Sequence, residues 1–345
     1  MKNALFIYVF AAVFLHGIFY NKVRAESHEK VETPQFIFPV GCSYGHDCWA
    51  VNYVDVNPSA DVREDFMCNR KTYEGHKGTD FALASMQQMQ KGVDVLAAAA
   101  GRVLRVRDSE NDVLKSKEEL KSLEKAQKEC GNGVLIDHGD GLQTIYCHLK
   151  QDSIIVKPKQ KVKAGQKLAR VGQSGLAEFP HLHFGVIWEG GIVDPYTGVL
   201  NTKGCGKNKK SLWHLGLPIK YDPVAIFNGG FDANVPDFDA MHRGDYQSPS
   251  MISLSSAAFI FWAGFYNVEK GDQVTLVVID PDGKVFTNSQ QTVPKIMTRQ
   301  YYYTGRKIGK VQLKSGTYKG VARITRIQET GENIMREKTF SIIVE

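Results

Sequence analysis

The sequence has no CxxC pair and no HExxH motif anywhere in its 345 residues. The first absence argues against a structural zinc site of the finger or ribbon type, which takes its cysteines in closely spaced pairs. The second absence removes the glutamate base of the helical metalloprotease motif. The nearest imitation, His28-Glu29 with Glu32, lacks the second histidine. Any proton transfer at a metal site in this chain would therefore fall to histidine.

A strong charge of either sign is also missing. The formal net charge is +6, and it falls to +3, from 40 basic and 37 acidic residues, when residues 1–25 are set aside. So small a surplus argues against a nucleic-acid partner, although it does not oppose binding to an anionic polymer. The content of 43% hydrophobic and 23% charged residues is ordinary for a globular protein. The length exceeds that of one compact core and predicts two domains with appendages.

The N-terminus predicts export. Lys2 precedes an apolar run over residues 4–20, and the small residues Val23 and Ala25 follow. This order is typical of a secretory signal peptide, which we place over residues 1–25. An uncleaved anchor is the alternative, because the run approaches membrane-spanning length. No cysteine lies at the junction to carry a lipid, so we expect no membrane attachment after cleavage.

All six cysteines lie beyond the signal peptide, and an even number in an exported chain favours disulfides over the alternative of zinc ligation. One pairing can be argued. The runs 132–137 and 142–148 are apolar and β-rich, and the HGDG sequence between them is a hairpin signal. Folding about this turn brings Cys130 near Cys147, so we expect a bridge between them.

The pattern of short strands predicts an all-β protein. A Cys-rich segment at 26–69 precedes a region, 70–198, in which Gly and Pro separate strand-like runs, as in an antiparallel β domain. These runs are 79–83, 93–99, 101–107, 133–137, 143–147, 167–171 and 181–188. A charged insertion at 108–130 has the leucine spacing of a surface helix.

The remainder of the chain predicts a second β domain. Residues 199–248 have few periodic apolar positions, and we expect a linker there. Residues 249–345 predict an Ig-like β-sandwich with a supporting or recognition role, since they hold no cluster of catalytic residue types. Its expected strands are 257–262, 273–279, 284–286, 301–304, 316–324 and 338–344.

Three motifs gather four histidines and one aspartate. His76 and Asp80 in GHKGTD are four residues apart, and the glycines favour a loop that enters a strand. His181 and His183 in PHLHF share one face of a strand, where two imidazoles are hard to satisfy without a metal or an acid. His148 lies in YCHL. This set exceeds what a structural metal site needs, and spacing leaves open which PHLHF histidine binds metal.

These motifs carry a resemblance. GHKGTD, GNGVLIDHGDGLQTIYCHL, VKAGQKLARVGQSG and PHLHFGV with the following VDP resemble, in order and spacing, the LytM/lysostaphin-type M23 zinc metallopeptidases. The likeness covers about residues 70–197. It implies an antiparallel β catalytic domain of the LytM-like, duplicated-hybrid-motif type, followed here by the Ig-like β-sandwich. Cys147 and the long 108–130 insertion depart from the family pattern.

The resemblance also implies a site and an activity. One Zn²⁺ per chain would be held by His76, Asp80 and His183, with His148 and His181 as catalytic histidines. The expected protein is an exported bacterial zinc metalloendopeptidase, periplasmic or extracellular. It would hydrolyse peptide cross-links of peptidoglycan through a zinc-bound water assisted by the two histidines. Its expected partners are peptidoglycan stem peptides and cross-links.

Two other functions stay open at this stage. One is a non-catalytic LytM-like regulator of cell-wall hydrolases, which is disfavoured because such proteins usually lose ligands and all five positions are filled here. The other is a secreted bacteriolytic lysin that uses the sandwich for targeting. Asn52 or another residue of the 41–75 segment is a further candidate, as an inhibitory ligand over the zinc. The sequence does not distinguish a D-amino-acid cross-link from a Gly-Gly bond.

Overall fold

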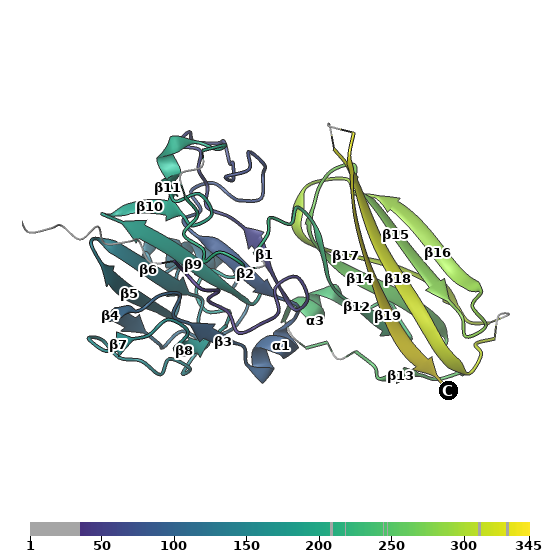
Figure 1. Cartoon of the computed structure of the whole chain (residues 1–345). Coiled ribbons are helices and arrows are strands. Elements are labelled where there is room, and N and C mark those ends of the chain that lie inside the picture. Colours follow the sequence, from purple (N-terminus) through teal and green to yellow (C-terminus); the bar gives the residue numbers. More distant parts are fainter. Residues whose placement is uncertain are drawn as a thin grey trace, which may run out of the picture. The chain divides into compact units, whose positions relative to one another are not determined.

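The computed structural model describes residues 35–207, 210–217, 219–243, 245–246, 248–309, 312–328 and 331–345. The signal peptide predicted over 1–25 lies outside these residues. Among the helices that are described, none has the length and apolar character needed to cross a membrane. Strands dominate, and nearly all of their pairings are antiparallel, as the sequence predicts (Figure 1).

One large antiparallel sheet carries the histidine motifs. Its strand order is β1-β2-β9-β6-β5-β4-β7, and β10 and β11 extend it beside β9. The strands are β1 (Cys48–Asn52), β2 (Thr79–Leu83), β4 (Gly101–Arg107), β5 (Gly133–Gly139), β6 (Leu142–Cys147), β7 (Lys161–Val162), β9 (His181–Trp188), β10 (Gly191–Asp194) and β11 (Val199–Leu200). A separate pair joins β3 (Asp94–Leu96) to β8 (Lys167–Arg170).

Short helices connect the strands of this region. They are α1 (Met86–Lys91), α2 (Lys117–Lys125) and a 3-10 turn (Asn201–Lys203). The helix α2 lies in the predicted charged insertion and starts with a capping box, in which Ser116 and Glu119 satisfy each other's backbone N–H groups. Its mostly exposed side chains agree with the expected surface helix.

The strand β1 was not expected, because the surrounding segment is rich in Gly, Asp and Cys. All five of its residues are buried, so the run lacks the alternation that marks a half-exposed strand. The strand pairs with β2, placing Asn52 opposite Asp80. The Cys-rich segment thereby contributes directly to the sheet that holds the candidate site.

The second region is a β-sandwich. Strands β12, β14 and β17 form one sheet, and β13, β19, β18, β15 and β16 form the other. Their bounds are β12 (Ala225–Asp232), β13 (Met251–Ile252), β14 (Ala258–Val268), β15 (Gln273–Ile279), β16 (Val285–Thr292), β17 (Met297–Lys307), β18 (Gly316–Ile327) and β19 (Asn333–Val344). All six expected runs overlap strands of these sheets, and β12 and β13 are additional.

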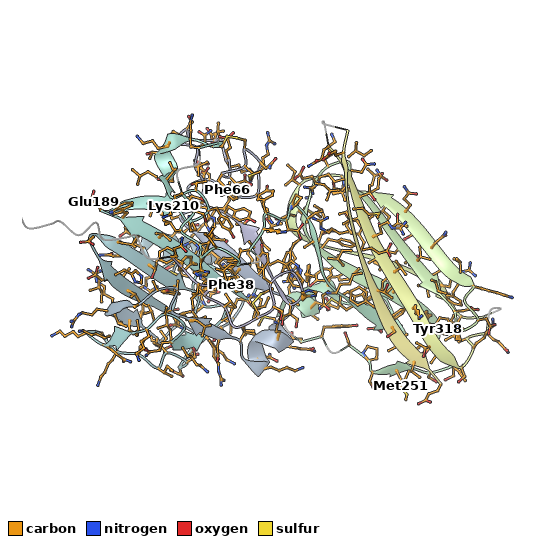
Figure 2. All side chains as sticks on the ribbon, viewed as in Figure 1. Phe38, Phe66, Glu189, Lys210, Met251 and Tyr318 are labelled. Carbon is orange, nitrogen blue, oxygen red and sulfur yellow. A yellow bond between two sulfur atoms is a disulfide. The ribbon has the colours of Figure 1, made fainter. Side chains whose placement is uncertain are left out.

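Each region has its own apolar core (Figure 2). In the first, Phe38 packs edge-on against Phe81 with 5.0 Å between ring centroids. In the second, Tyr318 packs against Phe259 at 4.8 Å. Aromatic contacts of this kind add to the burial energy of large side chains. The two cores are the main source of stability for the sheets.

Residues 199–248 contribute to both regions. Leu212 and Trp213 are buried in the first core, and Leu212 accepts a backbone hydrogen bond from Phe36 at 2.6 Å. Further along, β12 pairs with β14 in the sandwich, and α3 (Phe238–Arg243) follows. The domain boundaries proposed from sequence stay predictions.

A third buried cluster joins residues of both regions. It contains Trp49, Val51, Ala82, Phe179, Ala225, Phe227, Met241, Trp262, Tyr266 and Tyr301. The Tyr266 hydroxyl also donates a 2.8 Å hydrogen bond to the carbonyl oxygen of Leu83, at the end of β2. The sandwich is therefore packed against the strand that carries Asp80.

All six cysteines form disulfides, as expected for an exported chain. The predicted Cys130–Cys147 bridge is present, across the β5–β6 hairpin. The other bridges are Cys42–Cys48 and Cys68–Cys205. The sequence could not pair Cys68 with Cys205, because these two residues are 137 positions apart and meet only through the tertiary fold.

Removing each of the three bridges separately should destabilise the protein, and the loss should be largest for the bridge that closes the longest loop. The residue separations are 137 for Cys68–Cys205, 17 for Cys130–Cys147 and 6 for Cys42–Cys48. Loop-closure entropy then predicts losses of about 5, 3 and 2 kcal/mol in the free energy of unfolding. Urea unfolding of the three paired Cys→Ala variants measures this order, and a smallest loss for the 68–205 variant would contradict it.

Candidate metal and catalytic site

Antiparallel pairing of β2 with β9 brings the motifs together. Asp80 lies opposite His183, and Ala82 lies opposite His181. Residues opposite each other in such a pair have Cβ atoms about 5 Å apart, so a carboxylate and an imidazole can meet. His76, in the loop before β2, completes the group from the same side.

Three side-chain atoms converge on one point. His76 Nε2 lies 3.1 Å from Asp80 Oδ1 and 3.1 Å from His183 Nδ1, and His183 Nδ1 lies 2.9 Å from Asp80 Oδ1. Ligand atoms around a tetrahedral zinc with bonds of about 2.0–2.2 Å lie about 3.3–3.6 Å apart, which is close to these separations. The three groups can hold a metal ion, and two imidazoles with one carboxylate are donors that zinc accepts.

The backbone and one amide orient these groups. His76 Nδ1 lies 2.6 Å from the carbonyl oxygen of Tyr53, which can only accept, so the proton sits on Nδ1 and the lone pair on Nε2. The Asn52 side-chain nitrogen donates to Asp80 Oδ2 at 2.9 Å, and Oδ1 is left facing the histidines. Gly78 is required by close approach, since a Cβ there would lie 2.6 Å from His183 Nε2.

Asp80 is ionised in this setting. Burial alone would raise the pKa of its carboxyl group, because it disfavours the charged form. The neighbouring imidazoles of His76, His181 and His183 outweigh burial and hold the pKa of the Asp80 carboxyl group well below its usual range. A fixed negative charge therefore lies at the centre of the histidine group.

His181 and His148 form a second layer beside the three ligand atoms. Their rings are 4.5 Å apart, and His181 Nε2 lies 3.7 Å from Asp80 Oδ1. Each Nδ1 donates to a backbone carbonyl at 2.8 Å, His181 to Phe179 and His148 to Ser174. Each ring is therefore in the tautomer that is protonated at Nδ1, which leaves its Nε2 free to exchange a proton. Burial, followed by the charges of His181 and His183, holds the pKa of His148 well below its usual value, which favours the neutral ring.

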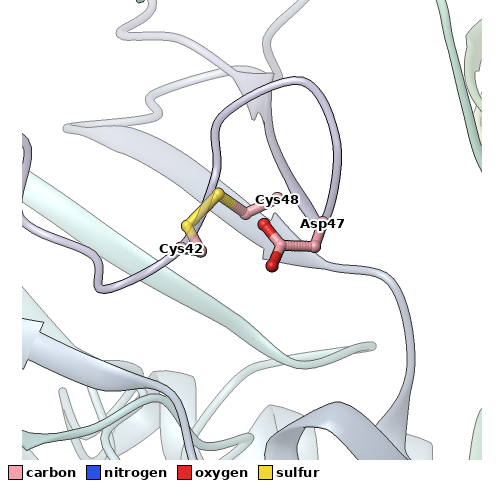
Figure 3. Close-up of side chains that lie close together, drawn as sticks. All are labelled: Cys42, Asp47 and Cys48. Atoms are coloured by element: carbon pink, nitrogen blue, oxygen red, sulfur yellow. A yellow bond between two sulfur atoms is a disulfide. The ribbon is translucent and has the colours of Figure 1, made fainter.

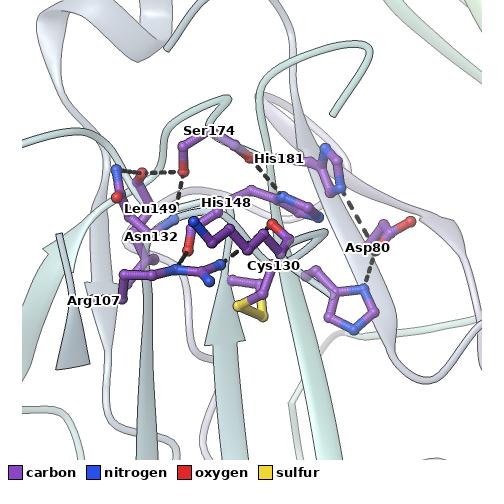
Figure 4. The surroundings of a disulfide bond; sticks show 12 residues. Asp80, Arg107, Cys130, Asn132, His148, Leu149, Ser174 and His181 are labelled. Carbon is purple, nitrogen blue, oxygen red and sulfur yellow. Dashed lines mark hydrogen bonds and ion pairs between the residues drawn. A yellow bond between two sulfur atoms is a disulfide. The ribbon is translucent and has the colours of Figure 1, made fainter. Parts of the chain in front are cut away.

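Several contacts fix the position of His148 (Figure 4). It adopts a left-handed backbone conformation with φ of 59°, which is uncommon for a residue with a side chain. Its N–H donates to the carbonyl oxygen of Cys130 at 2.9 Å, beside the Cys130–Cys147 bridge. The Asp112 carboxylate, from the charged insertion, accepts from the Gln173 N–H at 2.7 Å, next to Ser174. The insertion thus braces the loop that orients the His148 ring.

A cleft of about 290 Å³ opens beside these side chains. Its lining includes Asp80 and His181, together with Tyr73, Phe179 and Thr298. The Tyr73 ring also packs on the His76 ring, with 4.2 Å between centroids. Sequence reasoning missed Tyr73 and Thr298, because neither belongs to a spaced motif. The position of Tyr73 three residues before His76 was the one available signal.

Other groups in the described part of the chain are poorer candidates. Two clusters with metal-ligand atoms contain disulfides and so offer no thiolates. They are Cys42/Asp47/Cys48, drawn in Figure 3, and Glu64/Cys68/Cys205. A cavity of about 870 Å³ lies around Arg326, and no histidine lines it. Asp272 and Glu269 bind the Arg326 guanidinium there at 2.7–2.9 Å, so it serves the packing of the sandwich.

Comparison with known proteins relates one part of the chain to a family. Residues 74–195 match the model of peptidase family M23, and they include all five predicted site residues. This part of the chain is similar to an M23 peptidase domain. The match accounts for the order of the histidine motifs along the chain, as the resemblance implied.

Two proteins that are similar to this chain have names that describe different roles, an endopeptidase and an activator of hydrolases. The chain is 33% identical over 137 residues to the peptidoglycan DD-endopeptidase ShyB of Vibrio cholerae, which covers 39% of this chain and 26% of the relative. It is 31% identical over 121 residues to the murein hydrolase activator NlpD of Escherichia coli, which covers 35% of this chain and 25% of the relative. The chain thus spans about a quarter of the length of these curated relatives.

Among solved structures, a putative peptidase M23 from Pseudomonas aeruginosa is 31% identical. It covers 36% of this chain and 42% of its own, with a TM-score of 0.26. A zinc-containing peptidase from Vibrio cholerae is 28% identical over 45% of this chain and 40% of its own, with a TM-score of 0.27. The description of the fold given above rests on the strands and registers of this chain.

Substitution should separate the two histidines of PHLHF. His183→Ala should lose most bound zinc, because it removes one of three converging ligand atoms. His181→Ala should keep close to one zinc per chain, because its Nε2 lies outside that trio. Metal content by ICP-MS measures both variants against the wild type. A zinc-free His181→Ala beside a zinc-loaded His183→Ala would reverse the assignment.

Proposed function

We propose that this chain is an exported zinc metalloendopeptidase that hydrolyses peptide cross-links of bacterial peptidoglycan. The observation that carries the proposal is the convergence of His76, Asp80 and His183 beside two histidines with free Nε2 atoms. The proposed ligands are those three residues, and the proposed catalytic residues are His148 and His181. The match of residues 74–195 to the model of peptidase family M23 supports peptidase chemistry.

Zinc bound there would act as a Lewis acid that activates water and polarises the scissile carbonyl group. The chain supplies the remaining requirements. Asp80 and the two ligand histidines give the site its donor set. The Tyr53 carbonyl and the Asn52 amide hold His76 and Asp80 in the required orientation. Such supporting hydrogen bonds fix the tautomer and direction of each ligand.

Proton transfer falls to the histidines, as no HExxH glutamate exists. His181 Nε2 accepts the proton of the attacking water, since its Nδ1 proton is held by the Phe179 carbonyl. The His148 ring lies 4.5 Å from that of His181, and its unprotonated Nε2 shares with His181 the task of accepting this proton. The proton then passes to the leaving amine as the C–N bond breaks. One water is consumed, and a carboxylate and an amine are released.

The substrate proposal draws on the relatives. One of them is named as a peptidoglycan DD-endopeptidase, which fits cleavage of a cross-link. Another is named as a murein hydrolase activator, and this favours a second candidate, a regulator of cell-wall hydrolases. The filled ligand trio and the paired histidines support the enzyme over the regulator. The enzyme would act on peptidoglycan itself, whereas the regulator would act on the hydrolases that cut it.

Digestion of purified peptidoglycan tests the enzyme. The chain without residues 1–25, loaded with one zinc, should release fragments whose masses correspond to hydrolysis of a peptide cross-link. Treatment with a chelator should abolish release, and added zinc should restore it. Mass spectrometry of the fragments identifies the bond that is cut. If the zinc-loaded protein releases nothing alone but stimulates an added wall hydrolase, the regulator is the correct function.

The histidine variants complete this test. His148→Ala and His181→Ala should each keep zinc and lose about 10²–10⁴-fold in turnover, the usual contribution of a general acid or base. The double variant should lose less than the product of the two, because both side chains serve one transition state. His138→Ala is a matched control, since this histidine binds the Ala100 carbonyl and Thr144 away from the site. Full activity of either test variant would contradict its proposed role.

A further inference from the structure

The cleft beside the candidate site has one wall from outside the M23 domain. Thr298 lines it together with Asp80, His181 and Phe179, yet it belongs to β17 of the sandwich. More than one hundred residues separate it from His181 in the sequence. Thr298 is half-buried, so its side chain is available to a molecule that occupies the cleft.

The contacts that hold this wall are buried and specific. Arg299, the next residue of β17, lies opposite Tyr266 of β14 in the sandwich sheet. Its guanidinium carbon lies 5.8 Å from the centre of the Phe179 ring, and the Tyr266 ring lies 5.9 Å from the same ring. Cation–π and aromatic contacts of this kind prefer defined distances. The end of the β14–β17 pair therefore packs against the Phe179 ring through Arg299 and Tyr266.

A second set of contacts anchors the same sheet to β2. The Tyr266 hydroxyl donates to the Leu83 carbonyl at 2.8 Å, and the ring is fully buried. The Trp49 ring, from β1, packs against Tyr266 with 6.1 Å between centroids. A buried hydrogen bond between elements is costly to break, because it leaves unsatisfied polar groups. Thr298 thus keeps a fixed place relative to the strand that carries Asp80.

We propose that Thr298 is a specificity-determining residue, and that the sandwich forms part of the substrate-binding cleft. The proposal rests on the proposed function, since the occupant of the cleft would be the cross-linked peptide. Thr298 meets the part of the peptide that lies next to His181. The Thr298 side chain is small, so it leaves room in the cleft for a residue of the peptide that carries a side chain. Its hydroxyl group offers one donor and one acceptor to the peptide backbone. A bulky group at this position fills space that the peptide needs.

A thiol introduced by Thr298→Cys tests this in a single folded protein. All six native cysteines are bridged, so the new thiol reacts selectively with maleimides. The unlabelled variant gives the reference value of kcat/KM on soluble cross-linked muropeptide dimers, with which the labelled forms are compared. Labelling one sample with N-methylmaleimide and a second sample with a pyrene maleimide should lower kcat/KM in both, by about tenfold or more for the larger group. Zinc content by ICP-MS should stay at one per chain.

The matched control is Thr339→Cys, an exposed position on β19 of the same sandwich. The same labels there should leave kcat/KM unchanged. Complete labelling of Thr298→Cys without loss of activity would overturn the proposal, and so would a thiol that no maleimide reaches. Failure of the proposed function has a different signature, because the wild type itself would then cleave no dimer.

Discussion

The candidate site depends above all on the register of four adjacent strands. Asn52, Asp80, His183 and Cys147 lie directly opposite one another on β1, β2, β9 and β6, and so form one row across the sheet. A slip of one residue at any pairing would turn the moved side chains to the other face. Burial of the apolar residues around this row makes such a slip costly. The Cys130–Cys147 bridge holds the last strand of the row at its end.

Much of this arrangement was predictable, because its signals are local. PHLHF has the period of a strand, and β9 begins at His181 as expected. The HGDG turn predicted a hairpin and, through it, the Cys130–Cys147 bridge. The five motif residues do lie together in the fold, within a few ångströms of Asp80 or of each other's rings. Their individual roles stay predictions.

The parts that were missed have physical reasons. The strand β1 is buried on both faces, so it shows no alternation, and its Asn52 gains a role only by pairing with Asp80. The carbonyl groups of Tyr53, Phe179 and Ser174 set the histidine tautomers, but every residue has a carbonyl group, and sequence cannot single these out. Thr298 reaches the cleft only through tertiary packing.

Phe179 contacts both the sandwich and the candidate site. It lies in the buried cluster shared with the sandwich, and its carbonyl oxygen holds His181. A substitution that repacks the far side of this ring, on Tyr266 or Arg299, therefore affects His181 through a single residue. The packing of the sandwich and the orientation of the His181 ring are therefore linked through Phe179. Exchanging the sandwich for an unrelated one would require compensating changes around Phe179.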